Sequence, residues 1–198
     1  MQKITTIGLD IAKSVFQVHG VDAQGKVVIR RQLRRRYVLA FFQKLSPCLV
    51  GIEACASSHH WSRELQTLGH TVRLMPAAYV KPYVKRQKND AADAEAICEA
   101  VTRANMRFVK TKTVEQQSCL TLHRTRHLFI RQQTAVINAI RAHLAEFGIV
   151  APVGRNGVEE LLEVVADPSD NRVPEVARAC LTALGAQLRG AQGAHPGV

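Results

Sequence analysis

Apolar and polar residues alternate along the start of the chain in a way that predicts short strands. The run Ile4–Leu9 is mostly apolar, and Val15–Gly20 alternates apolar with polar residues, as a half-buried strand does. The turn-forming residues 21–25 separate this run from a third one, Lys26–Arg30. Three short strands joined by tight turns predict an antiparallel meander.

Helical patterns then alternate with further strands. We expect helices over residues 34–45, 59–68 and from 89 or 90 to about 106. Strands are expected at Leu49–Glu53 and Thr71–Leu74. This order of elements predicts an α/β domain whose mixed sheet is flanked by helices.

The longest helical pattern begins at Val114 and reaches about Phe147. Two apolar series repeat along it every seven residues, namely Leu122, Phe129, Val136 and Ile130, Ile137, Leu144. Such series are typical of a helix with an apolar seam, so we expect a partner helix from a second copy or from residues 157–188. Further helices are expected at 158–166 and 173–188.

Three regions follow from these patterns. Residues 1–108 are expected to form the α/β domain, residues 109–188 a helical coiled-coil arm, and the breaker-rich residues 189–198 a disordered tail. No stretch approaches the roughly 20 apolar residues of a membrane-spanning helix, and the N-terminus lacks a signal-peptide pattern. Five scattered cysteines without a CxxC pair indicate reduced thiols. A cytoplasmic protein without membrane contact is expected.

The charge of the chain is strongly basic and unevenly distributed. The formal net charge is +11, and residues 1–108 hold 17 Lys and Arg against 8 Asp and Glu. Residues 151–198, in contrast, hold 4 basic residues against 6 acidic ones. A basic field confined to the first three quarters of the chain favours a polyanionic partner, although it also fits a generic solubilising surface.

Half of the acids in residues 1–108 stand at expected element ends, namely Asp10, Glu53, Asp90 and Asp93. Carboxylates from separate elements are what Mg²⁺ requires to neutralise a phosphate and orient a nucleophile. Asp90 and Asp93 also fit an ordinary helix start, with a cap and an acid in the first turn. An acid directly after a buried strand, as at Glu53, is costly without a partner.

Two basic clusters are candidates for contact with nucleic-acid phosphates. They comprise Arg30, Arg31, Arg34, Arg35 and Arg36, and then Lys81, Lys85, Arg86 and Lys88 just before the two helical aspartates. Each cluster also fits a solvated face. Trp61 is expected to anchor the core, and His59 and His60 to be exposed polar residues at a helix start.

Three segments resemble the DEDD-type insertion-sequence transposases, which are recombinases guided by a bridge RNA. They are Gly8–Lys13, Gly51–Cys55 and Lys88–Ala94, in this order, and the resemblance extends to about Leu188. It implies a RuvC-like domain with an RNase H-like fold, a Mg²⁺-binding tetrad at the four named acids, and a helical coiled-coil arm. DNA and a structured guide RNA are the implied partners.

The resemblance also implies a second domain that supplies a nucleophilic serine. Ser169 is the one serine after Ser118 and stands in an Asp-Pro-Ser-Asp turn, so it is not assigned that role. The chain is therefore expected to be the front half of a recombinase, incomplete alone. A stand-alone RuvC-like junction endonuclease and a non-catalytic nucleic-acid-binding or dimerising fragment remain alternatives. A sugar-kinase-like ATPase ranks last, because no second phosphate loop follows residue 90.

Overall fold

The computed structural model describes residues 3–84 and 90–193, and the chain divides into two compact units, Met1–Val114 and Glu115–Val198. The first unit is built on a five-stranded mixed sheet of order β3-β2-β1-β4-β5. Its strands are β1 (Thr6–Ile11), β2 (Val15–Val21), β3 (Val27–Arg34), β4 (Leu49–Glu53) and β5 (Thr71–Met75). Strands β1, β2 and β3 form an antiparallel meander, and β4 and β5 continue the sheet in parallel with β1.

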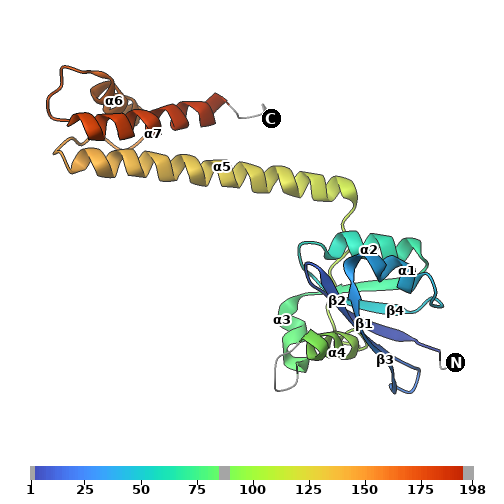
Figure 1. Cartoon of the computed structure of the whole chain (residues 1–198). Coiled ribbons are helices and arrows are strands. Elements are labelled where there is room, and N and C mark those ends of the chain that lie inside the picture. Colours follow the sequence, from blue (N-terminus) through green and yellow to red (C-terminus); the bar gives the residue numbers. More distant parts are fainter. Residues whose placement is uncertain (1–2, 85–89, 194–198) are drawn as a thin grey trace. The chain divides into compact units, whose positions relative to one another are not determined.

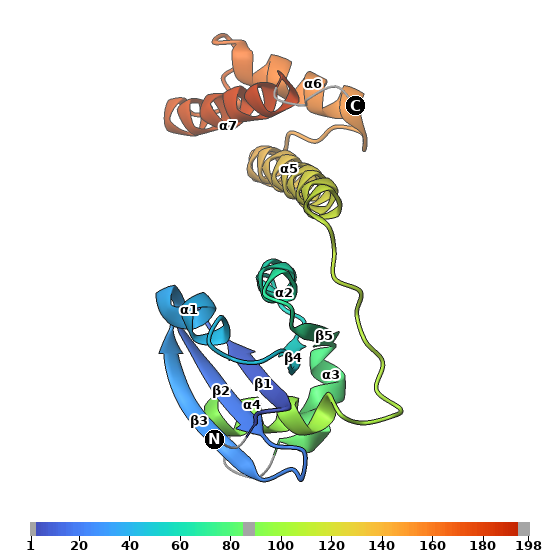
Figure 2. The same ribbon diagram turned by 90° about the vertical axis from the view of Figure 1, so that its right-hand side faces the viewer.

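Helices cover both faces of this sheet (Figures 1 and 2). The short helix η1 (Arg35–Tyr37) leads into α1 (Val38–Phe42), which lies with α2 (Ser58–Thr67) on one face. Helix α4 (Asp90–Ala100) covers the other face, after the short helices α3 (Ala77–Val80) and η2 (Lys81–Tyr83). The expected mixed α/β architecture is confirmed, and it is consistent with an RNase H-like fold.

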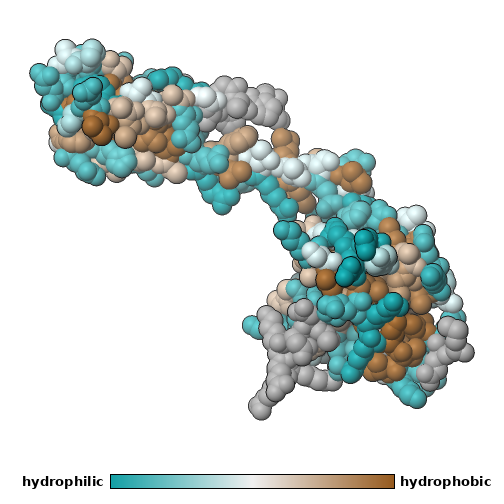
Figure 3. All heavy atoms as spheres, in the orientation of Figure 1, coloured by the Kyte–Doolittle hydropathy of each residue, from teal (hydrophilic) through white to brown (hydrophobic). Residues whose placement is uncertain are grey.

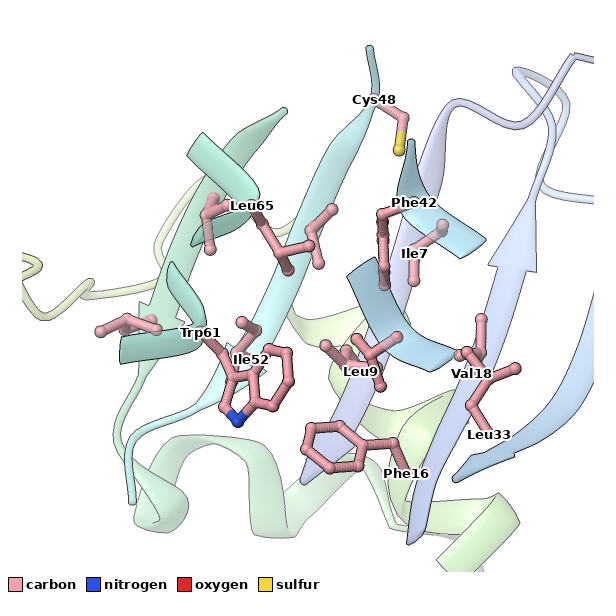
Figure 4. Packing of buried hydrophobic residues seen from close by; sticks show 14 residues of the cluster. Ile7, Leu9, Phe16, Val18, Leu33, Phe42, Cys48, Ile52, Trp61 and Leu65 are labelled. Atoms are coloured by element: carbon pink, nitrogen blue, oxygen red, sulfur yellow. The ribbon is translucent and has the colours of Figure 1, made fainter. Parts of the chain in front are cut away.

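The face under α1 and α2 holds the main hydrophobic core (Figure 4). Ile7, Leu9 and Ile52 from the central strands are fully buried there. Trp61 of α2 packs edge-on against Phe16 of β2 with ring centroids 4.9 Å apart, so it anchors the core as expected. The side chains that meet here alternate along each strand, because successive residues of a strand face opposite sides of the sheet.

The other face carries glycines where α4 crosses the sheet. A Cβ atom on Gly8 would lie 2.1 Å from the carbonyl oxygen of Ala94 and 2.4 Å from the backbone nitrogen of Cys98. A Cβ atom on Gly51, the partner of Gly8 in the register of β1 and β4, would lie 2.8 Å from the Val101 side chain. Helix α4 can therefore pack this close to the sheet only because both positions are glycines.

The second unit consists of three helices: α5 (Val114–Ala145), α6 (Arg155–Ala166) and α7 (Glu175–Gly193). Val136, Ile140 and Leu144 on the C-terminal part of α5 are buried against apolar residues of α6 and α7, such as Leu161 and Leu181. The preceding turns of α5 expose large apolar side chains instead, and Figure 3 shows hydrophobic atoms interrupting the polar surface of this helix. No helix among the described residues is long and apolar enough to cross a membrane.

Two arginines hold the connections between these helices. Arg141 donates hydrogen bonds to the carbonyl oxygens of Ala151 at 3.0 Å and Pro152 at 2.7 Å. Arg178 does the same for the end of α6, donating to the carbonyls of Val164 at 3.0 Å and Val165 at 2.8 Å. Carbonyl groups at helix ends and in loops lack the backbone N–H donors that a helix provides. The two guanidinium groups donate hydrogen bonds to these carbonyls instead.

The structure departs from the expected elements in three places. Strand β3 continues to Arg34, where a helix is expected to begin, because its later residues pair with Val15–Gln17 of β2. Helix α4 ends at Ala100 and not near Met106, since the chain turns there to bring Val109 beside Leu74 of β5. Helix α7 runs to Gly193, so it includes the first five residues of the expected tail.

We expect Gly8→Ala to lower the free energy of unfolding by roughly 2–3 kcal/mol, because the added methyl group meets backbone atoms that have no room to move. Gly190→Ala is the control. Its Cβ meets no atom within 4 Å, and alanine stabilises a helix interior by roughly 0.5–1 kcal/mol. Urea denaturation followed by circular dichroism measures both, and equal stabilities would contradict the close seating of α4.

Candidate functional site

The carboxylates of Asp10 and Glu53 lie at the carboxyl ends of two neighbouring parallel strands. In the register of β1 and β4, Gly8 is opposite Gly51 and Leu9 is opposite Ile52, and the two acids are the next residues. Gly8 and Gly51 face α4, so Asp10 and Glu53, two residues farther along, face the same side. Both side chains are partly buried.

Helix α4 brings the third element that carries acids to this face. Its Ala94 carbonyl packs directly over Gly8, and the half-buried Asp93 immediately precedes Ala94. Asp90 is the first residue of α4, but its side chain is outside the part of the chain that the structure describes. The elements bearing all four predicted acids thus lie against one another, on one face of the sheet.

Three of the four predicted acids have side chains that the structure describes, namely Asp10, Glu53 and Asp93. Among the described side chains, no group of three or more from His, Cys, Asp or Glu is placed to hold one ion. The tetrad therefore stays a prediction. The donors are nevertheless of the right kind, because carboxylate oxygens are the ligands that Mg²⁺ prefers.

The predicted basic residues of β3 and η1 are all exposed, and the sheet divides them between its faces. Arg30 lies on the α4 side, where it pairs with Glu95 at 3.3 Å. Arg34 faces the same side as Arg30, because alternate residues of a strand face the same side of the sheet. Arg31 faces the opposite side together with Leu33. Of the second cluster, Lys81 is exposed at the start of η2, and Lys85, Arg86 and Lys88 lie outside the described residues.

Two of these arginines pack on aromatic rings. The Arg35 guanidinium carbon lies 5.1 Å from the centre of the Trp61 ring and 5.9 Å from that of Phe16. Arg36 lies 4.7 Å from the centre of the half-exposed Tyr37 ring. These cation–π contacts hold both cations near the surface, where one face of each guanidinium stays open to a further group.

His59 is the residue that sequence reasoning places wrongly. It is expected at an exposed helix start, but its side chain is only 9% exposed. The segment 109–113 covers it, and the backbone N–H of Lys112 donates to His59 Nδ1 at 3.1 Å. Burial comes from residues about fifty positions later, so no local pattern around α2 signals it.

The two buried cysteines, Cys48 and Cys98, favour the neutral thiol form. Burial raises the pKa of the Cys48 thiol to about 11, with a further contribution from Cys98, and burial likewise raises that of Cys98 to about 11. All five cysteines are free, as expected from their spacing.

Comparison with known proteins assigns the family. The model of the IS110-type DEDD transposases matches residues 7–149, which include all but the first residue of β1 and the whole of β4, α4 and α5. The chain belongs to this family of transposases. The match covers the three segments in which the sequence resembles such proteins.

Individual relatives agree with this assignment. The chain is 55% identical over 163 residues to a probable family 20 transposase of Pseudomonas aeruginosa, covering 82% of the chain and 48% of the relative. A putative transposase of Sinorhizobium fredii is 48% identical over 96% of the chain and 48% of its own length. The transposase for insertion sequence element IS1328 of Yersinia enterocolitica is 37% identical over 93% of the chain and 54% of its own length. The chain spans about half the length of these curated relatives.

His59 gives the transposase chain a predictable pH dependence. Burial, reinforced by the positive charges of Lys112 and Arg63, lowers the pKa of His59 from its usual 6.5. The folded state therefore favours the neutral ring. The stability this site contributes is complete above pH 6.5 and is lost as the pH falls from there through the lowered folded-state pKa.

We expect His59→Asn to remove this component, because asparagine still accepts the Lys112 N–H bond but does not titrate between pH 5 and 7.5. Thermal unfolding midpoints of wild type and variant should converge as the pH falls. The exposed His123 provides the matched control, and His123→Asn should run parallel to wild type throughout. If the difference in unfolding midpoint between wild type and His59→Asn stayed constant from pH 5 to 7.5, this would contradict a buried neutral ring at His59.

Proposed function

We propose that this chain supplies the metal-dependent half of an insertion-sequence recombinase, in which Asp10, Glu53, Asp90 and Asp93 hold Mg²⁺ for DNA strand cleavage and transfer. The observation that carries the proposal is the placement of Asp10 and Glu53 side by side on parallel strands, facing the helix that bears the other two acids. Bound Mg²⁺ would neutralise a phosphate and orient the attacking group. The chain's own part is to hold the carboxylates on rigid elements.

The basic residues extend the proposal to its partners. Arg34 lies on the same face as Asp10, where the paired residues Asp10, Gln17 and Gln32 run across three strands. A nucleic-acid backbone following this row would meet Arg34 next to the carboxylates. We assign Arg30, Arg31 and Arg34–Arg36, together with Lys81, Lys85, Arg86 and Lys88, to DNA and a structured guide RNA.

The proposal divides the chemistry between two regions of a longer protein. Residues 1–108 are the acidic RuvC-like domain and residues 109–188 the helical arm. Ser169 is not proposed as the nucleophile, since it donates its hydroxyl to Asp167 Oδ1 at 2.6 Å within an exposed turn. Strand transfer is therefore proposed for the recombinase as a whole, with this chain as its Mg²⁺-binding part.

Asp10→Asn and Glu53→Gln should abolish the stabilisation of the chain by Mg²⁺. Binding to the folded state alone contributes about 1.4 kcal/mol at ten times the Kd, and each variant removes one charged ligand while keeping the shape of the side chain. Calorimetric titration and thermal midpoints with and without Mg²⁺ measure the effect. Glu64→Gln is the control, because Glu64 lies on α2 away from the strand ends. A full Mg²⁺ response in Asp10→Asn would refute the site.

We further propose that two copies of the chain associate through the early turns of α5 as a coiled coil. Leu122, Phe129 and Val136 fall within about 40° of one another around the helix, and the first is 45% exposed. Ile130, at 40% exposed, flanks this stripe. The later members of both series pack on α6 and α7, so the earlier ones are the part left for a second copy.

Leu122→Glu should shift the chain from dimer to monomer, because a buried glutamate at the seam is left without compensation. Leu128→Glu is the matched control. Leu128 is also 45% exposed but lies about 120° away from Leu122 around the helix. Light scattering coupled to size-exclusion chromatography measures the mass, and an equal effect of both substitutions would contradict the seam.

A further inference from the structure

The segment 109–113 forms a strap that is fastened to β5 at Val109 and to α2 at Thr111 and Lys112. Val109 N–H donates to the Leu74 carbonyl at 2.8 Å, and the hydroxyls of Thr111 and Ser62 are 2.7 Å apart. Arg63 donates to the Lys112 carbonyl at 2.6 Å. The strap therefore holds Lys112 in a fixed position beside the first turn of α2.

At that position two hydrogen-bond donors face each other. The Lys112 backbone N–H donates a hydrogen bond to His59 Nδ1. Because Nδ1 is the acceptor, the proton of the neutral ring must be on Nε2. Nε2 lies 3.1 Å from Lys112 Nζ, and an ammonium group has three donors and no acceptor. No ion pair among the described residues involves Lys112 or Arg63. The contact becomes favourable when an oxygen atom accepts from both groups.

We propose that this pair of donors, His59 Nε2–H and Lys112 Nζ, binds a phosphate oxygen of a nucleic-acid backbone, with Arg63 adding positive charge beside it. Phosphate suits the site because its oxygens accept several hydrogen bonds at once and carry the charge that offsets the nearby cations. His59 contributes a nine-tenths buried donor in a fixed orientation.

Two observations favour a nucleic-acid backbone over a free phosphate ion. Residues 100–114 contain Arg103, Arg107, Lys110 and Lys112 and no acidic residue, which is an extended basic strip and not a single charged pocket. Helix α2 begins at Ser58, five residues after Glu53 ends β4. The site therefore lies at the same end of the sheet as the carboxylates, where the DNA of the proposed function must pass.

The inference rests on the proposed function only in that nucleic acid is the ligand, and its test needs no metal ion. Full-length chain labelled with ¹⁵N is titrated in EDTA with a double-stranded oligonucleotide, and separately with inorganic phosphate at the same phosphate concentration. The His59 Nε2 signal should shift with the oligonucleotide at concentrations where inorganic phosphate has a much weaker effect. No shift with the oligonucleotide, or an equal shift with both, overturns the backbone assignment.

Substitutions give an independent test by fluorescence anisotropy with the same oligonucleotide. His59→Asn keeps the acceptor for the Lys112 N–H bond but removes the Nε2 donor, and Lys112→Gln removes the ammonium group. Each should weaken binding by about fivefold to tenfold, and Lys112→Gln should lower the salt dependence by about one phosphate contact. Lys110→Gln is the control, because it makes the same charge change on an exposed residue of the same strap.

An effect of Lys110→Gln as large as that of Lys112→Gln overturns the specific site in favour of diffuse attraction. Should a variant fail to fold, as judged by circular dichroism, the titration of the wild-type chain still decides. The result for this phosphate site can also be distinguished from the result for the Mg²⁺ site. A His59 response in a chain that ignores Mg²⁺ would contradict the metal site alone, and Mg²⁺ binding without a His59 response would contradict the phosphate site alone.

Discussion

The parallel pairing of β1 with β4, seated tightly under α4, is the constraint on which the candidate chemistry depends. Gly8 and Gly51 are opposite each other in this pair, and both lack the side chain that would push α4 away. Because the helix approaches to backbone distance, the strands that carry Asp10 and Glu53 are held against the helix that carries Asp93. A single methyl group at Gly8 would separate the elements that the function needs together.

Charge follows the same geometry. Arg30 and Arg34 of β3 lie on the same face of the sheet as the carboxylates, whereas the basic strap is fastened to α2, which covers the other face. In the proposed function, positive charge on that face and bound divalent cations would together hold a polyanion close to carboxylates that otherwise repel it. The second unit has a different balance, since residues 151–198 hold 4 basic residues against 6 acidic ones.

The sequence predicts most of the sheet because the strands carry their own periodicity. Leu49–Glu53 is predicted with its observed bounds, and the glycine-flanked acids are visible as motifs. The sequence does not predict the features that depend on contacts between distant parts of the chain. The run of arginines ending at Arg34 has no strand-like alternation, yet pairing with β2 makes it a strand. His59 is buried by a strap about fifty residues away, and the α4 end is fixed by the return of Val109 to β5. The sequence motifs single out the four acids, while the packing of α4 on β1 that brings their elements together is set by tertiary structure.

The two outer strands of the sheet end its growth in different ways. Strand β3 presents Arg30, Arg31 and Arg34, and β5 is partly capped by the bridge between Leu74 and Val109. Unpaired backbone groups on outer strands invite intermolecular sheet formation and aggregation. The positive charges on β3 and the segment that covers part of β5 discourage such pairing between molecules. Both outer strands of the sheet are thereby protected from fibre-like self-association.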